Sequence, residues 1–102
     1  MASRLQLQSA LETIIGSRNV YFQPPESLKL KYPCVLYWRD NADTTHANNM
    51  PYTFTQHYSV TLVEKIPDSP HVKAIAMGFP MIRHARTYVA DNLYHDVFDL
   101  YY

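Results

Sequence analysis

Hydrophobic residues recur at helical spacing near the start of the chain. Four of them stand at positions i, i+4, i+7 and i+8 and form one stripe of an amphipathic helix: Leu7, Leu11, Ile14 and Ile15. The pattern predicts a helix over residues 4–15. Ser3 and Gln6 resemble a capping box at its start, and Gly16 fits a left-handed cap at its end.

Alternating apolar and polar residues predict strands in the middle of the chain. Residues 52–64 alternate most clearly, with one side mostly apolar and the other polar with β-branched residues, as in a sheet covered on one face. The mostly apolar side consists of Tyr52, Phe54, Gln56, Tyr58, Val60 and Leu62. A short run at 19–23 and a longer one at 28–39 precede it. Pro33 cannot donate a ladder hydrogen bond, so we expect the run at 28–39 to be an edge strand or to bulge there.

Residues 40–51 separate these strands and differ from both. They are polar and have no periodicity, which predicts a long loop. Loops of about a dozen residues are uncommon in compact domains unless they have a function. This segment is therefore the first place to look for contacts with other molecules.

A second, shorter helix is predicted after residue 68. Ser69 suits the N-cap position and Pro70 suits the first helical position. Its apolar stripe consists of Val72, Ile75 and Ala76. Gly78 can cap its end.

The remaining residues have the pattern of a β-hairpin. Two runs rich in aromatic and β-branched residues, from Ile82 and from Leu93, flank the polar pair Asp91 and Asn92. The second run ends on Tyr101 and Tyr102. Large aromatic residues at a chain end would otherwise fray into water, so we expect them to pack on this chain's own core or on a neighbouring copy.

Together these elements predict one α+β domain over residues 1–102, in the order α-β-β-β-α-β-β. An antiparallel sheet with both helices packed on it is the simplest arrangement. The net charge is zero and the sequence pI is near 7.0, which argues against a free-standing nucleic-acid binder. Without a signal-peptide pattern or a run long enough to span a membrane, we expect a soluble protein made in a reducing compartment.

The five histidines and the single cysteine are the residues that could carry chemistry. None of the five histidines forms a metal-binding pair at helical spacing, although His46, His57 and the residues between them are a weaker candidate for a metal or hydrolytic site. Cys34 lies between Tyr32 and Leu36 on an apolar face and is interpreted as a buried thiol. We therefore expect no catalytic residue, no metal and no cofactor.

Two acids on the last predicted strand do not form a pair of neighbouring carboxylates. Asp96 and Asp99 are three residues apart, so they point to opposite faces of a strand. Asp96 shares its face with Phe98 and needs a partner. Arg83, Arg86 or a residue of an adjacent subunit could supply that partner.

Several segments resemble small neck and tail proteins of tailed bacteriophages. They are residues 20–25 (Val-Tyr-Phe-Gln-Pro-Pro), 31–34 (Lys-Tyr-Pro-Cys), 58–63 with 67–69, and 88–95. The predicted order of elements is similar to that of the tail terminator, or tail completion, family. The resemblance covers most of the chain, from Leu5 to Tyr102, and rests on strand, turn and cap residues.

The resemblance implies a structural protein of the virion and no enzyme. Such a protein forms a ring, usually a hexamer, that caps the tail tube and docks on the head-side neck protein, with DNA passing through the lumen without specific binding. It would assemble in the host cytoplasm and would need no membrane. A head-closure (stopper) or adaptor ring of the same neck is the alternative, and a host-directed adaptor or inhibitor binding through a tyrosine-rich face is a third hypothesis.

The resemblance and the pattern together indicate where contacts with subunits or rings should lie. Loops of the family reach into the lumen or towards adjacent rings, and residues 40–51 match them. The expected contact residues are Asp40, Asp43, His46, Asn48 and Asn49 in this loop, and His95 and Tyr101 on the last strand.

Overall fold

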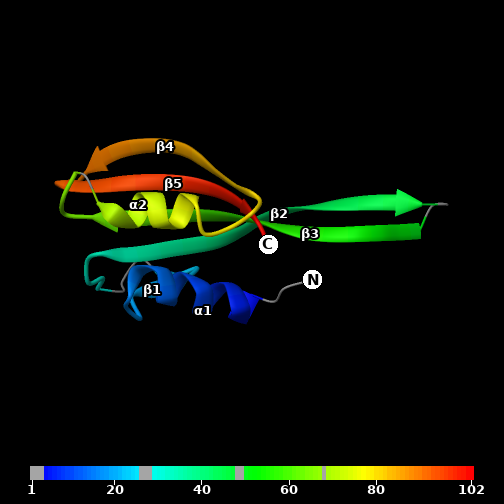
Figure 1. The fold of residues 1–102 in the computed structure, drawn as a ribbon, viewed down its shortest axis with the longest axis horizontal. Coiled ribbons are helices and arrows are strands. Elements are labelled where there is room, and N and C mark those ends of the chain that lie inside the picture. The colour runs from blue at the N-terminus through cyan, green and yellow to red at the C-terminus, as the bar shows by residue number, and fades with distance from the viewer. Residues whose placement is uncertain (1–3, 26–28, 48–49, 68) are drawn as a thin grey trace.

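The computed structural model describes residues 4–25, 29–47, 50–67 and 69–102. Two helices and five strands follow one another in the predicted order, so the fold is α+β (Figure 1). The elements are α1 (Arg4–Ile15), β1 (Val20–Phe22), β2 (Cys34–Ala47), β3 (Met50–Glu64), α2 (Pro70–Ala76), β4 (Ile82–Ala90) and β5 (Leu93–Tyr101).

The five strands form one mixed sheet in the order β1-β2-β3-β5-β4. The expectation of a wholly antiparallel sheet was wrong in one place, because β1 runs parallel to β2 while the other neighbours are antiparallel. The segment between Phe22 and Cys34 carries the chain back to the other end of the sheet, which a parallel pair requires. The strand expected from residue 28 begins only at Cys34, so Pro33 precedes the ladder and needs neither an edge nor a bulge.

The helix ends follow local chemistry that could be predicted from the sequence. Helix α1 has the predicted bounds, and Gly16 follows it with a φ of 67° in the left-handed region. The suggested capping residue Ser3 lies outside the described residues. Ser69 caps α2, because its side chain accepts a hydrogen bond from the backbone N–H of His71 at 3.2 Å, and Pro70 follows at the first turn.

Gly78 follows the end of α2 as expected and has a second role at the contact with α1. Met77 is the C-cap of α2, and Gly78 donates its backbone N–H to the carbonyl of Ile75 at 3.1 Å. A Cβ at Gly78 would lie 2.8 Å from Cδ1 of Ile14 and 2.9 Å from the carbonyl oxygen of Ala74. The glycine thus allows α1 and α2 to approach closely.

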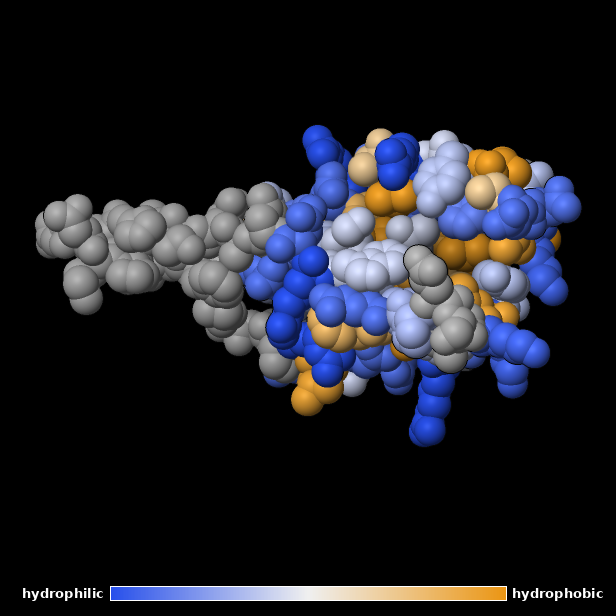
Figure 2. Space-filling model, turned by 180° about the vertical axis from the view of Figure 1, so that it is seen from behind, coloured by the Kyte–Doolittle hydropathy of each residue, from blue (hydrophilic) through white to orange (hydrophobic). Residues whose placement is uncertain are grey.

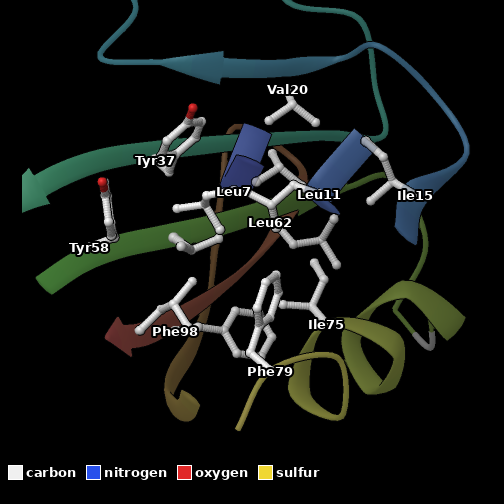
Figure 3. Close-up of a cluster of buried hydrophobic side chains, with 13 residues drawn as sticks. Leu7, Leu11, Ile15, Val20, Tyr37, Tyr58, Leu62, Ile75, Phe79 and Phe98 are labelled. Carbon is white, nitrogen blue, oxygen red and sulfur yellow. The ribbon is translucent and has the colours of Figure 1, made fainter. Parts of the chain in front are cut away.

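The core lies between the helices and one face of the sheet (Figure 3). Side chains of both helices and of β1, β2, β3 and β5 meet there, including Leu7, Leu11, Val20, Val35, Tyr37, Tyr58, Val60, Leu62, Ile75, Phe98 and Leu100. The predicted apolar side of β3 is confirmed at Tyr58, Val60 and Leu62. On β2 the helices cover Val35 and Tyr37, whereas Cys34 is buried on the other face, so this run has apolar residues on both sides.

The predicted loop at 40–51 is instead the outer part of a long hairpin. Strands β2 and β3 pair from Cys34↔Val63 to Ala47↔Met50, with irregular register near residues 39–42 and 45–46. Strand β1 pairs with β2 only at 35–37, and β5 pairs with β3 only at 57–64. We call residues 42–47 and 50–56 the arm; it projects beyond the body and gives the molecule a long axis of 51 Å against 28 and 23 Å (Figure 1).

The physical reason for this error is the absence of a second layer along the arm. Backbone pairing alone satisfies the N–H and C=O groups between the two strands. Neither a third strand nor a helix is paired or packed beside it in the described part of the chain. Alternation in a strand records a covered face, so an uncovered hairpin need not alternate.

The hairpin of β4 and β5 has the predicted turn. Asp91 and Asn92 have φ values of 53° and 61°, as a two-residue type I′ turn requires. Tyr101 and Tyr102, at the end of β5, were expected to be packed, and both contact other rings of this chain. The ring of Tyr102 lies 5.7 Å from that of Phe79, and the ring of Tyr101 lies 4.9 Å from that of His57.

Candidate functional site

A row of four polar side chains crosses the sheet on the face away from the helices. Asp40 of β2, His57 of β3, Asp99 of β5 and Arg83 of β4 each come from the next strand in the sheet. Nδ1 of His57 lies 3.3 Å from Oδ2 of Asp40, and Nε2 of His57 lies 3.4 Å from Oδ1 of Asp99. Nη2 of Arg83 donates to Oδ2 of Asp99 at 2.7 Å.

The row is exposed at both ends and buried at its centre. The side chain of Asp40 is 62% exposed and that of Arg83 is 77% exposed, whereas that of His57 is only 10% exposed. Nδ1 of His57 is buried without a hydrogen-bond partner among the described residues, because its approach to Asp40 has the distance of an ion pair without the direction of a hydrogen bond. Buried polar atoms usually have a hydrogen-bond partner, so this nitrogen is unusual among the described residues.

The hydrogen bond to Asp99, with the charge of that carboxylate, raises the pKa of the Arg83 guanidinium. Arg83 therefore remains a cation and neutralises Asp99 in the row. Among the described residues, Asp40 has no such arginine beside it, and its ion-pair partner is His57. The acidic end of the row is thus the end at the root of the arm.

A cleft of about 650 Å³ opens beside this row, a volume in the range of small-ligand sites. It is lined by Asp40, His57, Pro80, Met81, Ile82, Arg83, Asp99 and Tyr101. Two acids, two bases, one phenol and three apolar residues therefore share one hollow. In Figure 2, which views the molecule from behind, hydrophilic residues gather on the body near the arm, and hydrophobic patches gather towards its other end.

A second polar cluster joins the end of β3 to the start of α2. The hydroxyl of Ser69 donates to the buried carboxylate of Glu64, and Nδ1 of His71 lies 3.1 Å from Oε2 of Glu64. Serine, histidine and glutamate also form hydrolytic triads, but there the histidine bonds the serine hydroxyl. Here both side chains turn to the carboxylate, so the cluster is a helix cap.

Asp96 finds partners that differ from those expected. Thr87 donates its hydroxyl to Oδ1 of Asp96 at 2.6 Å, and Nε2 of His84 lies 3.0 Å from the same oxygen. The expectation of Arg83 or Arg86 was wrong, because the strand register places Thr87 opposite Asp96 and turns Arg83 to the other face. The prediction that Asp96 and Asp99 face opposite sides is confirmed.

The structure brings together two of the seven expected contact residues. Asp40 and Tyr101 line the cleft, whereas His95 stacks on Tyr88 with ring centroids 4.6 Å apart and planes 9° apart. The backbones of Asp43 and His46 lie on the arm, paired with Thr55 and Pro51. The expected residues Asn48 and Asn49 lie outside the described residues.

Three residues of the cleft were not expected as a group. The sequence makes His57 a candidate together with His46, and it relates Asp99 and Arg83 to Asp96. The signal that could have joined them is the pairing of β3, β5 and β4, which sets His57 near Tyr101 and Arg83 opposite Asp99. That register is a property of three dimensions and is not visible in one sequence.

No three His, Cys, Asp or Glu side chains within the described part of the chain are placed to hold a metal ion. None of the helices described is long and apolar enough to cross a membrane. In comparisons with known proteins, no protein-family model matches the chain and no curated protein matches it.

Cys34 provides a pH-dependent test of the sheet face that bears the row. Burial, with a smaller effect from the charge of Glu64, raises the pKa of the Cys34 thiol from 9.0 to about 12. The unfolded thiol loses its proton first as the pH rises, so between about pH 9 and 12 this group lowers the free energy of unfolding by about 1.4 kcal/mol per pH unit. Urea unfolding at stepped pH should show a slope that Cys34→Ala lacks; equal slopes in both proteins would contradict the burial.

Proposed function

We propose that this protein is a ring-forming structural protein of the bacteriophage head–tail neck, acting as the tail terminator. In this role a hexamer would cap the tail tube and join it to the head-side neck protein, in the virion and after assembly in the host cytoplasm. The protein would act through sheet edges and contacts, without catalysis. The observation that carries the proposal is the arm, a paired hairpin that leaves the body and has no third strand beside it among the described residues.

An arm of this kind is suited to contacts between molecules. Its two outer ladder edges present unpaired backbone N–H and C=O groups, which can pair with another chain. The described residues of the buried cluster all lie in other segments. A role outside its own chain gives a physical reason for such a segment.

The composition is compatible with a conduit for DNA. Nine acidic and nine basic residues cancel, so the chain as a whole does not attract a polyanion strongly. Such neutrality would let DNA pass through a lumen without tight binding. Strands rich in tyrosine suit protein contacts, since tyrosine is enriched at interfaces.

Two alternative functions remain: another ring of the neck, and a domain that binds or hydrolyses a small molecule. A head-closure or adaptor ring has similar needs for edges and arms. The cleft supports a second candidate of another class, a small ligand-binding or hydrolytic domain, because the buried His57 lies between two carboxylates there. Neither serine nor cysteine lines the cleft in the described part of the chain, so such a domain would use His57 as a base acting on water.

The position of the chain in purified particles separates these roles. Virions containing the chain should show it, in a map with side-chain detail, as a ring at the head–tail junction. Mass spectrometry of tails that lack heads and of heads that lack tails then assigns the ring: a terminator remains with the tails and a stopper with the heads. A junction with no density for this chain would overturn the proposal, whereas a monomer in solution would not.

Tyr101 is the expected contact residue that is easiest to test. We expect Tyr101→Ala to lower the free energy of unfolding by less than about 2 kcal/mol, because its ring is only half-buried. The variant should nevertheless fail to enter virions if this face is an interface. Thermal unfolding and quantitative immunoblots of particles measure the two effects. Tyr21→Ala, on the edge strand β1 away from the cleft, is the control. A Tyr101→Ala protein that assembles normally would remove Tyr101 from the contact.

A further inference from the structure

The strand β4 ends the sheet with a long free edge. It has nine residues, and β5 is its neighbour on one side, whereas no described strand pairs with its other side. All of its residues between Ile82 and Ala90 are exposed. Sheet edges of this length are templates for pairing with another strand.

The charge on β4 restricts which strand can pair with it. The strand contains Arg83 and Arg86 and no acid, so two copies of β4 placed edge to edge would bring like charges together. Arg83 is already bound to Asp99. Arg86 lies over the ring of Tyr88 at 5.5 Å and has no acidic partner among the described residues. The free edge therefore favours an acidic strand.

The arm supplies a strand of the required charge. From Asp40 to Gln56 the chain contains the acids Asp40 and Asp43 and neither lysine nor arginine. The outer part of β2, from Ala42 to Ala47, pairs only with β3 and has a free edge of its own. Asp43 on the arm thus has the charge that complements Arg86, the arginine of β4 that no described acid neutralises.

The shape of the molecule excludes pairing of the two within one chain. The arm points away from the body, while β4 folds back along the body beside β5 (Figure 1). The strand at the edge of one copy can therefore meet only the arm of another copy.

We propose that the arm of one copy pairs with the β4 edge of the next copy, adding the outer part of β2 to its sheet. The contact is head-to-tail, because it joins two different surfaces, and repeated contacts of this kind close a ring or extend a filament. That these contacts close into a ring rests on the proposed function. The pairing itself concerns any two copies of the chain.

A charge exchange tests the pairing directly. Asp43→Lys and Arg86→Glu should each reduce self-association about tenfold, and the double variant should restore it to within about twofold, because the charges are opposed again with reversed sign. Native mass spectrometry of the purified chain and its incorporation into virions are the two readouts. Arg18→Glu makes the same charge change as Arg86→Glu at an exposed position after α1 and should change neither.

The outcomes separate the pairing from the proposed function. Single variants that associate normally, or a double variant that stays as weak as the single ones, would overturn the pairing. Rings in virions whose subunits meet without the arm would overturn the pairing and leave the neck function intact. Association in solution that follows the charge exchange, with the chain absent from virions, would support the pairing and overturn the neck function. No association of the wild-type chain in either setting would overturn both.

Discussion

Replacing Phe98 by alanine should lower the free energy of unfolding by about 3–5 kcal/mol, the usual range for a fully buried phenylalanine. Phe98 has no exposed surface and lies in the middle of β5, opposite Val60 of β3 and His84 of β4. Its ring also meets that of His84 edge-to-face, with centroids 5.2 Å apart and planes 83° apart. Truncation would leave a cavity that the strands on both sides cannot fill.

Urea unfolding followed by far-ultraviolet circular dichroism measures this loss. Leu5→Ala is the control, since Leu5 is 66% exposed on α1 and its removal should change the stability by less than about 0.5 kcal/mol. Phe98→Leu should fall between wild type and Phe98→Ala because it keeps part of the volume. A loss below about 1 kcal/mol for Phe98→Ala would mean that β5 is not in the core.

The second large loss of stability is expected on replacing Ser69, because its hydroxyl makes two hydrogen bonds. It caps α2 by accepting the N–H of His71, and it donates to the buried carboxylate of Glu64. Loss of an N-cap costs about 0.5–2 kcal/mol. Loss of the hydrogen bond to the buried carboxylate of Glu64, which keeps its contact with His71, costs about 1.5–3 kcal/mol more. Ser69→Ala should therefore lower the free energy of unfolding by about 2–4 kcal/mol.

Two further substitutions separate the parts of this effect. Ser69→Thr keeps both the acceptor and the donor and should be the mildest change. Ser69→Asp keeps a good N-cap but sets a second carboxylate beside Glu64, so it should be destabilised although capping is preserved. Chemical unfolding of the three variants measures the order. If Ser69→Asp matched Ser69→Thr, the contact with Glu64 would add little to stability.

The elements with a covered face were those that the sequence could predict. In α1 the stripe of Leu7, Leu11 and Ile15 records the core that it packs on, and Gly16 marks its end. The turn at Asp91 and Asn92 is a local preference and was equally visible. These signals need no knowledge of the rest of the chain.

What failed depended on contacts between distant segments. Residues 42–47 of the arm are predicted as a loop because no layer covers them and they do not alternate, although residues 53–56, with which they pair in part, do alternate. The parallel pairing of β1 with β2 is set by which edge a three-residue strand joins, and its residues do not encode that choice. The row from Asp40 to Arg83 needs the register of four strands at once, although each of its residues is ordinary in its own segment.

The order of the strands also constrains when the body can form during synthesis. Strand β5 is the last in the sequence but lies inside the sheet, between β3 and β4. Until residues 93–101 have left the ribosome, β3 has an unpaired edge beside Tyr58, Val60 and Leu62, and the core lacks Phe98 and Leu100. Nascent chains with exposed strand edges and apolar surface are prone to aggregate. The core therefore cannot be complete before β5 has emerged, and chaperone capture of stalled nascent chains should fall sharply once it has.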